Sequence, residues 1–423
     1  MSNMAYRKSS TLCTVHLIHL RLTPEQVAHC ERLRREAGRC WSDLVTFHRT
    51  ARAAHEWPSV REVELFGAAQ GYALHSQSIQ ALAQQLETNL KTATRLRQQE
   101  LAETGQITTQ YPYHTPTFQT LVWKSPALQW QADGSLRLSN GKSAAPLLLR
   151  LPDAYHDADM RQVALCWQAD HYELALTIDT GREPLPPRTE GQGAGVDLGE
   201  VYIAALTAES GETLVINGRG LRSEKRRLNK RLGHLSAKQA TKQKGSTRWK
   251  KLQRQKDKER AHSRRRQRDI LHKASRQAVS FAEAHDVRTL AVGDVRDIQD
   301  GVNLGRKSNQ KISQWSHGKF EHYLTYKAQQ VGIAVESIPE DYSTRTCSVC
   351  EHVANSPPRG RLYRCRNPKC RVLLHRDANG SANICSRAVY GCYGKVQVTR
   401  ITYRRRIQFR RRSAVDTRVP SGR

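Results

Sequence analysis

Long apolar runs, aromatic side chains and negative charge are all scarce in this sequence. No stretch approaches the roughly 18 consecutive apolar residues that a membrane-spanning helix needs, and no apolar signal segment follows Met1. Aromatic residues make up only 6% of the 423 residues, but hydrophobic residues reach 38%, which suffices for folded cores and excludes wholesale disorder. We therefore expect a cytoplasmic protein of roughly two to four domains with no membrane partner.

Positive charge is concentrated in two segments. Lys and Arg number 69 against 39 Asp and Glu, so the net charge is +30. Residues 219–268 contain 21 basic and three acidic residues, and residues 395–423 contain ten and one. A solvated helix face and a disordered tail would explain some of this charge. Its concentration indicates a polyanionic partner instead, and we expect that partner to be nucleic acid.

The two basic segments differ in character. The first contains one aromatic residue, Trp249, which favours contact with a nucleic-acid backbone over base stacking. Residues 393–423 carry arginine runs at 404–406 and 410–412 without periodicity, and we interpret them as a mobile basic tail. The candidate nucleic-acid-binding residues are Arg226, Arg227, Lys250, Lys251, Arg264, Arg265 and Arg266.

Cysteines are not distributed as in a small disulfide-bonded domain. Four of the ten, Cys347, Cys350, Cys365 and Cys370, fall within 24 residues, in two pairs with spacings of two and four intervening residues. Paired cysteines on short turns supply the four soft ligands of a tetrahedral zinc ion. We predict a zinc ribbon over residues 345–372, whose closed four-ligand site is structural, not catalytic.

The N-terminal half alternates between strand and helix patterns. An alternating strand at 11–22 is followed by the capping signal Thr23-Pro24-Glu25-Gln26, which predicts a helix to about residue 55, and a second helix is expected near 76–103. Strand-like runs follow up to residue 182. We predict a small antiparallel β-barrel from residues 1–22 and 106–182, a helical domain inserted at 23–105, and a linker at 183–194.

The C-terminal half predicts a multi-domain α/β protein with a ribonuclease H-like domain. The expected order is a strand containing Asp197, a hairpin, long basic helices over 219–285, a strand at 288–294, a helix at 313–331, a strand at 332–339, the cysteine module and a final helix. This order is typical of a ribonuclease H-type sheet with helices on both faces. The domain spans 195–344 and 373–392.

Two aspartates have positions suited to metal-dependent hydrolysis. Asp197 lies in the sequence GVDLG on the first strand, and Asp377 lies in HRDANGSANI at the start of the last helix. Each alone is typical of a turn or a helix cap. In a ribonuclease H-type site, however, carboxylates from these two elements hold two Mg²⁺ ions for attack on a phosphodiester.

The motifs GVDLG, DILHKASR, VGD, YSTRTCSVC and HRDANGSANI, in this order, resemble the RuvC nuclease of TnpB proteins, relatives of the compact type V CRISPR effectors. The resemblance covers residues 191–385 and extends more weakly to the barrel as a wedge domain and the helices as a recognition domain. It implies a prokaryotic, nucleoid-associated protein that pairs a guide RNA with one strand of double-stranded target DNA and cuts with one RuvC site.

One position departs from the family pattern. The second acidic motif usually has a glutamate ligand where this sequence has Gly293. Glu340 is the preferred replacement, because it follows a strand expected to run parallel beside 288–294, so that both ends open on the same edge of the sheet. Asp294 and Glu321 are alternative replacements. The fourth possibility is that no other carboxylate replaces the missing glutamate.

Three functions are therefore compared. The first is an RNA-guided, Mg²⁺-dependent DNA endonuclease, favoured as a monomer, with Asp197, Glu340 and Asp377 as catalytic metal ligands. The second is an RNA-guided DNA-binding protein that blocks transcription without cutting, which Gly293 favours. A strand-transfer transposase is the third, and it explains the basic helices less well than a bound structured RNA does.

Overall fold

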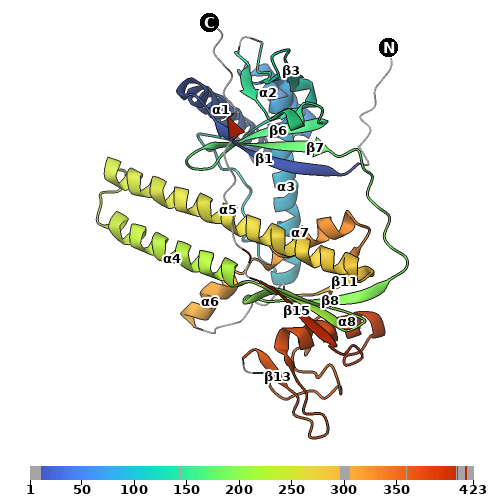
Figure 1. Ribbon diagram of the computed structural model, residues 1–423. Helices are drawn as coiled ribbons and strands as arrows, with labels where there is room; N and C mark the ends of the chain where they lie inside the picture. The colour runs from blue at the N-terminus through green and yellow to red at the C-terminus, as the bar shows by residue number, and fades with distance from the viewer. Residues whose placement is uncertain are drawn as a thin grey trace. The chain divides into compact units, whose positions relative to one another are not determined.

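The computed structural model describes residues 11–142, 144–295, 305–358, 360–405, 407 and 415–416 (Figure 1). The chain divides after Arg182 into two compact units, of which Thr11–Arg182 and Glu183–Arg411 form the greater parts. Within the described residues, no helix combines the length and the apolar character needed to cross a membrane.

Between β1 and β2 along the chain, the first unit contains three helices: α1 (Pro24–Ala53), α2 (Val60–Ala69) and α3 (Ser76–Thr104). The capping signal at the start of α1 forms as predicted, because Thr23 and Gln26 each accept the other's backbone N–H. The sequence analysis did not predict α2, although Ser59 and Glu62 form a second capping box at its start. The helices expected at 24–55 and 76–103 are confirmed.

The strands of the first unit form two sheets. The larger has the order β16-β1-β7-β6-β2 and the smaller the order β3-β4-β5. Asp133-Gly134 makes the turn between β3 and β4, with Gly134 at a φ of 77°. The predicted closed barrel stays a prediction. The strands are β1 (Cys13–Arg21), β2 (Leu121–Lys124), β3 (Leu128–Trp130), β4 (Ser135–Leu138), β5 (Leu147–Arg150), β6 (Met160–Trp167), β7 (Tyr172–Asp179) and β16 (Val415–Asp416).

The second unit is built on a six-stranded sheet of order β12-β11-β8-β9-β10-β15. The central strand β8 runs parallel to β11 and antiparallel to β9, and β11 in turn runs parallel to β12. The succession of strands and helices is the expected one with two additions, a helix at 306–313 and a strand at 400–404. The strands are β8 (Gln192–Leu198), β9 (Tyr202–Ala208), β10 (Glu212–Asn217), β11 (Val287–Gly293), β12 (Ala334–Ile338) and β15 (Arg400–Arg404).

Helices cover both faces of this sheet (Figure 1). Ala194, Val196 and Leu198 of β8 point toward α5 (Thr247–Ala284) and α7 (His317–Gln329) and share a core with them. The intervening residue Gly195 lies directly against the backbone of α8 (Arg376–Tyr390), where a side chain would not fit. The helix expected at 313–331 is shorter in the structure, where α7 begins at His317. Ser313 belongs to a separate helix, α6 (Arg306–Ser313).

The C-terminal tail corrects one expectation. Residues 393–423 were expected to be a mobile arm, but residues 400–404 form β15 and pair in parallel with β10. The alternation of Ile401 and Tyr403 within the arginine-rich stretch fits an edge strand. The preceding Val396 and Val398 pack on α8. Arg406 and residues 410–412 lie outside the described residues.

The cysteine module is inserted between β12 and α8 and contains the hairpin of β13 (Leu362–Arg364) and β14 (Leu373–His375). Buried amides of α8 bind its first loop. The Ser348 N–H donates to Asn379 Oδ1 at 3.0 Å, and Asn379 Nδ2 and Asn383 Nδ2 both donate to the Thr346 carbonyl, at 2.8 and 2.7 Å. The module is therefore tied to the helix that carries Asp377.

Candidate active site and metal centre

Asp197 lies near the end of β8, on the sheet face covered by α8. Its carboxylate lies against Gly380, where an added Cβ would come within 2.5 Å of Asp197 Oδ2. Gly380 is inside α8, a position at which glycine costs helix stability. The close approach explains this glycine, since any side chain would displace the carboxylate.

Asp377 is in the first turn of α8 and is 4% exposed. Its carboxylate accepts from Arg376 Nε at 3.0 Å and lies 3.3 Å from Arg361 Nη1 of the cysteine module. Asp197 and Asp377, which are 180 positions apart in the sequence, are close enough for the charge of Asp377 to raise the pKa of Asp197.

Glu340 occupies the space that a side chain at position 293 would fill. A Cβ built on Gly293 would lie 3.2 Å from Glu340 Cβ and collide with the Glu340 carboxylate. The cause is the register of the parallel pair, in which Gly293 is opposite Ile338, two residues before Glu340. The glycine and the displaced glutamate are therefore complementary.

The three carboxylates are electrostatically unfavourable together. Burial raises the pKa of Asp197 well above its usual range, and the charges of Asp377 and Glu340 raise it further, although Arg376 and Arg361 oppose them. Burial also raises the pKa of Glu340 to about 7, with additional contributions from Asp294 and Asp341. Bound cations would therefore stabilise the ionised forms of these carboxyl groups.

The two alternative acids lie differently. Asp294 is near Glu340, whose pKa its charge raises, but it is not among the charges that raise the pKa of Asp197. Glu321 is on α7, whose neighbours Phe320 and Leu324 pack on the sheet face opposite α8. The structure thus brings Asp197, Glu340 and Asp377 together and places Glu321 on the other side of the sheet.

This donor set fits magnesium. Carboxylate oxygens are hard ligands, and the pKa values of Asp197 and Glu340 are raised first by burial and then by neighbouring carboxylates, so a bound cation would favour their ionised forms. Asp197, Glu340 and Asp377 are the residues that would hold the ions. Bound Mg²⁺ would activate water and stabilise the leaving oxygen of a phosphodiester.

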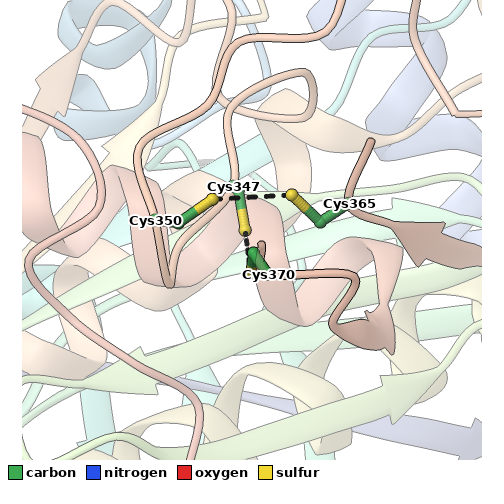
Figure 2. A group of neighbouring side chains, drawn as sticks. All are labelled: Cys347, Cys350, Cys365 and Cys370. Carbon is green, nitrogen blue, oxygen red and sulfur yellow. Dashed lines mark hydrogen bonds between the residues drawn. The ribbon is translucent and has the colours of Figure 1, made fainter. Parts of the chain in front are cut away.

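The four cysteines of the module converge (Figure 2). Their sulfur atoms all lie within 4.8 Å of one another, with Sγ–Sγ distances of 4.0 Å between Cys347 and Cys370 and 3.5 Å between Cys350 and Cys365. A zinc tetrahedron with bonds of ~2.3 Å has sulfur–sulfur edges of ~3.8 Å, so the cluster fits zinc. Asn367 donates its backbone N–H to Cys365 Sγ and its side-chain N–H to Cys350 Sγ.

Replacing Cys347 or Cys365 by Ser is expected to remove one zinc ion per chain and to lower the folding yield, because metal binding contributes folding free energy in such modules. Elemental analysis of the purified protein measures the zinc. Cys392→Ser is the control, since Cys392 is exposed and outside the cluster. Absence of zinc from the unsubstituted protein would contradict the prediction.

The basic residues proposed for nucleic-acid binding divide into two groups. Arg227 forms ion pairs with Glu224 and Glu259, each at 2.8 Å, and Arg266 pairs with Glu224 at 3.1 Å. These contacts join α4 (Arg219–Ala240) to α5. The exposed members of the set are Arg226, Lys250, Lys251 and Arg264, and Arg265 is partly exposed.

The sequence analysis gave no role to three site residues, Arg361, Arg376 and Gly380. Arg361 contacts Asp377 from 16 positions away across the β13–β14 hairpin, and no local pattern announces such a contact. Gly380 had a usable signal, because a glycine inside a helix commonly marks a close approach.

Family models match two segments of the chain, the first of which begins in β7 at the end of the first unit. Residues 176–299 match a model described as a probable transposase, and residues 317–384 match a Cas12f1-like TNB domain. Among curated relatives, a TnpB-like protein of Methanocaldococcus jannaschii is 29% identical over 118 residues, which are 27% of this chain and 41% of the relative. The CRISPR-associated endodeoxyribonuclease Cas12f2 of a Micrarchaeota archaeon is 25% identical over 129 residues, 28% of this chain and 23% of the relative.

The matched segments thus span less than half the length of these relatives. A cryo-EM structure of a Cas12f1–sgRNA–target DNA complex matches the fold with a TM-score of 0.59 at 12% identity, covering 89% of this chain and 99% of that chain. The sequence matches fall on the segments that carry Asp197, Asp377 and the cysteine module. On these matches, the chain resembles TnpB-like proteins and the compact Cas12f proteins over the segments that carry the candidate site.

Proposed function

We propose that this protein is an RNA-guided DNA endonuclease that cuts with a single RuvC site of the ribonuclease H type. The observation that carries the proposal is the convergence of Asp197, Asp377 and Glu340 on one face of the six-stranded sheet. Strand order β12-β11-β8-β9-β10, with β9 antiparallel to its neighbours, supports the ribonuclease H-type assignment.

The chain's own residues prepare the site for hydrolysis. Gly380 and Gly293 leave room for the carboxylates of Asp197 and Glu340, which lie close enough for the charge of Glu340 to raise the pKa of Asp197. Arg376 and Arg361 hold the Asp377 carboxylate at the start of α8. The amides that bind the cysteine module to α8 fix that helix, which supports a structural zinc ion as a requirement for an ordered site.

The partners proposed are a guide RNA and double-stranded target DNA, for a monomer in a prokaryotic nucleoid. The α4–α5 hairpin supports RNA binding, because Glu224 and Glu259 are engaged inside it while Arg226, Lys250 and Lys251 remain exposed. The first unit is proposed as wedge and recognition domains that read a short DNA motif beside the target.

A cleavage assay tests the proposal. The protein purified with its RNA is incubated with plasmids carrying the matching target, with and without Mg²⁺, and the bound RNA is sequenced. We expect one RNA of defined sequence and cutting that requires both Mg²⁺ and the target. Tight target binding without cutting would favour the transcriptional block that Gly293 suggests, and absence of a defined RNA would favour strand transfer.

Replacing Arg226, Lys250, Lys251 and Arg264 together by Ala is expected to weaken RNA binding and to reduce the salt dependence of its logarithm by roughly 0.7–0.9 per lost phosphate contact. Titration of RNA at several salt concentrations measures the slope. Lys91→Ala is the control, since Lys91 is exposed on α3 and pairs with Glu87. An unchanged slope would assign these four side chains to solvent.

A further inference from the structure

Three aromatic rings lie close to the carboxylates, and the function proposed above gives these rings no role. Tyr202 begins β9, His375 directly precedes α8, and Tyr403 is in β15. The His375 ring contacts Tyr202 at 5.0 Å and Tyr403 at 5.8 Å between centroids, in both cases edge to face. The Arg361 guanidinium lies 5.9 Å from the Tyr202 ring centroid. We call these four residues the tyrosine platform.

The platform is on the same sheet face as the carboxylates. Asp197 pairs with Ala205, Ala205 with Val215, and Val215 with Tyr403, so one row of paired residues crosses the sheet. With neighbouring strands ~4.8 Å apart, the backbone of Tyr403 is ~14 Å from that of Asp197. Arg361 bridges the interval, because it contacts both Asp377 and Tyr202.

Exposure and polarity distinguish the platform from a core. Tyr403 is 54% exposed although it faces a helix-covered side of the sheet. His375 is 9% exposed, and neither of its ring nitrogens has a hydrogen-bond partner among the described residues. A buried histidine without partners is an unfavourable arrangement for purely structural packing. Tyr403 offers an exposed ring on which a base can stack, and Arg361, beside the neighbouring Tyr202 ring, offers a guanidinium that can pair with a phosphate of the same strand.

We propose that Tyr403, supported by His375 and Tyr202, stacks on an unpaired base of the DNA strand that enters the carboxylate site, while Arg361 contacts that strand's phosphate. The assignment of the strand as DNA rests on the proposed function. The platform would hold the strand a few nucleotides from the scissile bond and would require that it be single-stranded there.

The test compares Tyr403→Ala, Tyr403→Phe and Tyr390→Ala in the full chain with its RNA. Tyr390 is the matched control, because it is 50% exposed at the opposite end of α8. Fluorescence anisotropy with a thymidine oligonucleotide in Mg²⁺-free buffer measures affinity without cutting. We expect Tyr403→Ala to bind roughly 5- to 100-fold more weakly, with the Phe variant and the control unchanged. The difference should vanish on an oligonucleotide that lacks bases.

Three results would overturn the proposal: equal affinities of Tyr403→Ala and the control, equal losses in the Ala and Phe variants, or a loss confined to RNA oligonucleotides. Melting temperatures of the variants check folding, and the Phe variant keeps the ring in place. Weaker DNA binding by Tyr403→Ala in a protein that never cuts would support the platform while contradicting the endonuclease, so the two failures are distinguishable.

Discussion

Asp197→Asn is expected to abolish target cleavage, by about a thousandfold or more, while target binding by the RNA complex stays within about twofold. The carboxylate would be lost from the site that activates water and stabilises the leaving oxygen, which is worth several kcal/mol of the barrier. Binding depends on base pairing and on phosphate contacts elsewhere. Asp377→Asn should behave in the same way, since its carboxylate faces the same cluster.

Asp197→Asn should also stabilise the folded protein in the absence of metal ions. Because the folded-state pKa of Asp197 is above the unfolded value of about 4, the ionised group makes folding less favourable as pH rises above that value. Asparagine removes this penalty at neutral pH, so the variant should melt at a higher temperature than the parent in Mg²⁺-free buffer.

Plasmid cleavage, target binding and thermal melting of the same preparations measure the three effects. Glu336→Gln is the matched control, because Glu336 is an exposed acid on β12 with no contact to the cluster in the described structure. Cleavage by Asp197→Asn at the parent rate would contradict the assigned site, and loss of target binding would assign Asp197 to a structural role.

Local signals in the sequence predicted the parts of the fold that depend on local chemistry. The Thr23–Gln26 capping box forms where the residues indicated, and Asp133-Gly134, a dipeptide typical of tight turns, joins β3 and β4. The strand β15 was missed because the arginine run obscured the alternation of Ile401 and Tyr403, and pairing with β10 decides its conformation. An edge strand gains its hydrogen bonds from a partner that is distant in the sequence.

The sequence was sufficient to predict the two aspartates of the candidate site, but not the contacts that arginine side chains make. Asp197 and Asp377 followed from their places at the start and end of a recognisable strand order. Arg227 forms ion pairs with Glu224 and Glu259. The pair with Glu224 has a local signal in its i, i+3 spacing, but the pair with Glu259 depends on how α4 packs on α5. Composition alone could not separate such internal arginines from exposed ones.

Glu340→Ala is expected to reduce cleavage about as severely as Asp197→Asn, whereas Asp294→Asn and Glu321→Gln should leave appreciable activity. The charges of Glu340 and Asp377 both act on Asp197, while Glu321 is on the opposite side of the sheet. Rates of plasmid cutting with matched guide and target, beside target binding, measure the effect. A Glu340→Ala variant that cuts as fast as the parent would contradict the rearranged site.

The complementarity of Gly293 and Glu340 permits a sharper test by exchange. Gly293→Glu alone should inactivate the protein, because its Cβ would collide with the Glu340 carboxylate. Adding Glu340→Ala removes the colliding carboxylate and leaves Ile384 Cδ1 at 3.0 Å and the Cβ of residue 340 at 3.2 Å, contacts that a shift of a few tenths of an ångström relieves. A glutamate at position 293 can then extend toward Asp197 and Asp377. We therefore expect the double variant to cut faster than either single variant, a reversal of sign that two independent losses would not produce. A double variant that is not faster than both single variants would show that the site needs the carboxylate of Glu340, two residues beyond the end of β12.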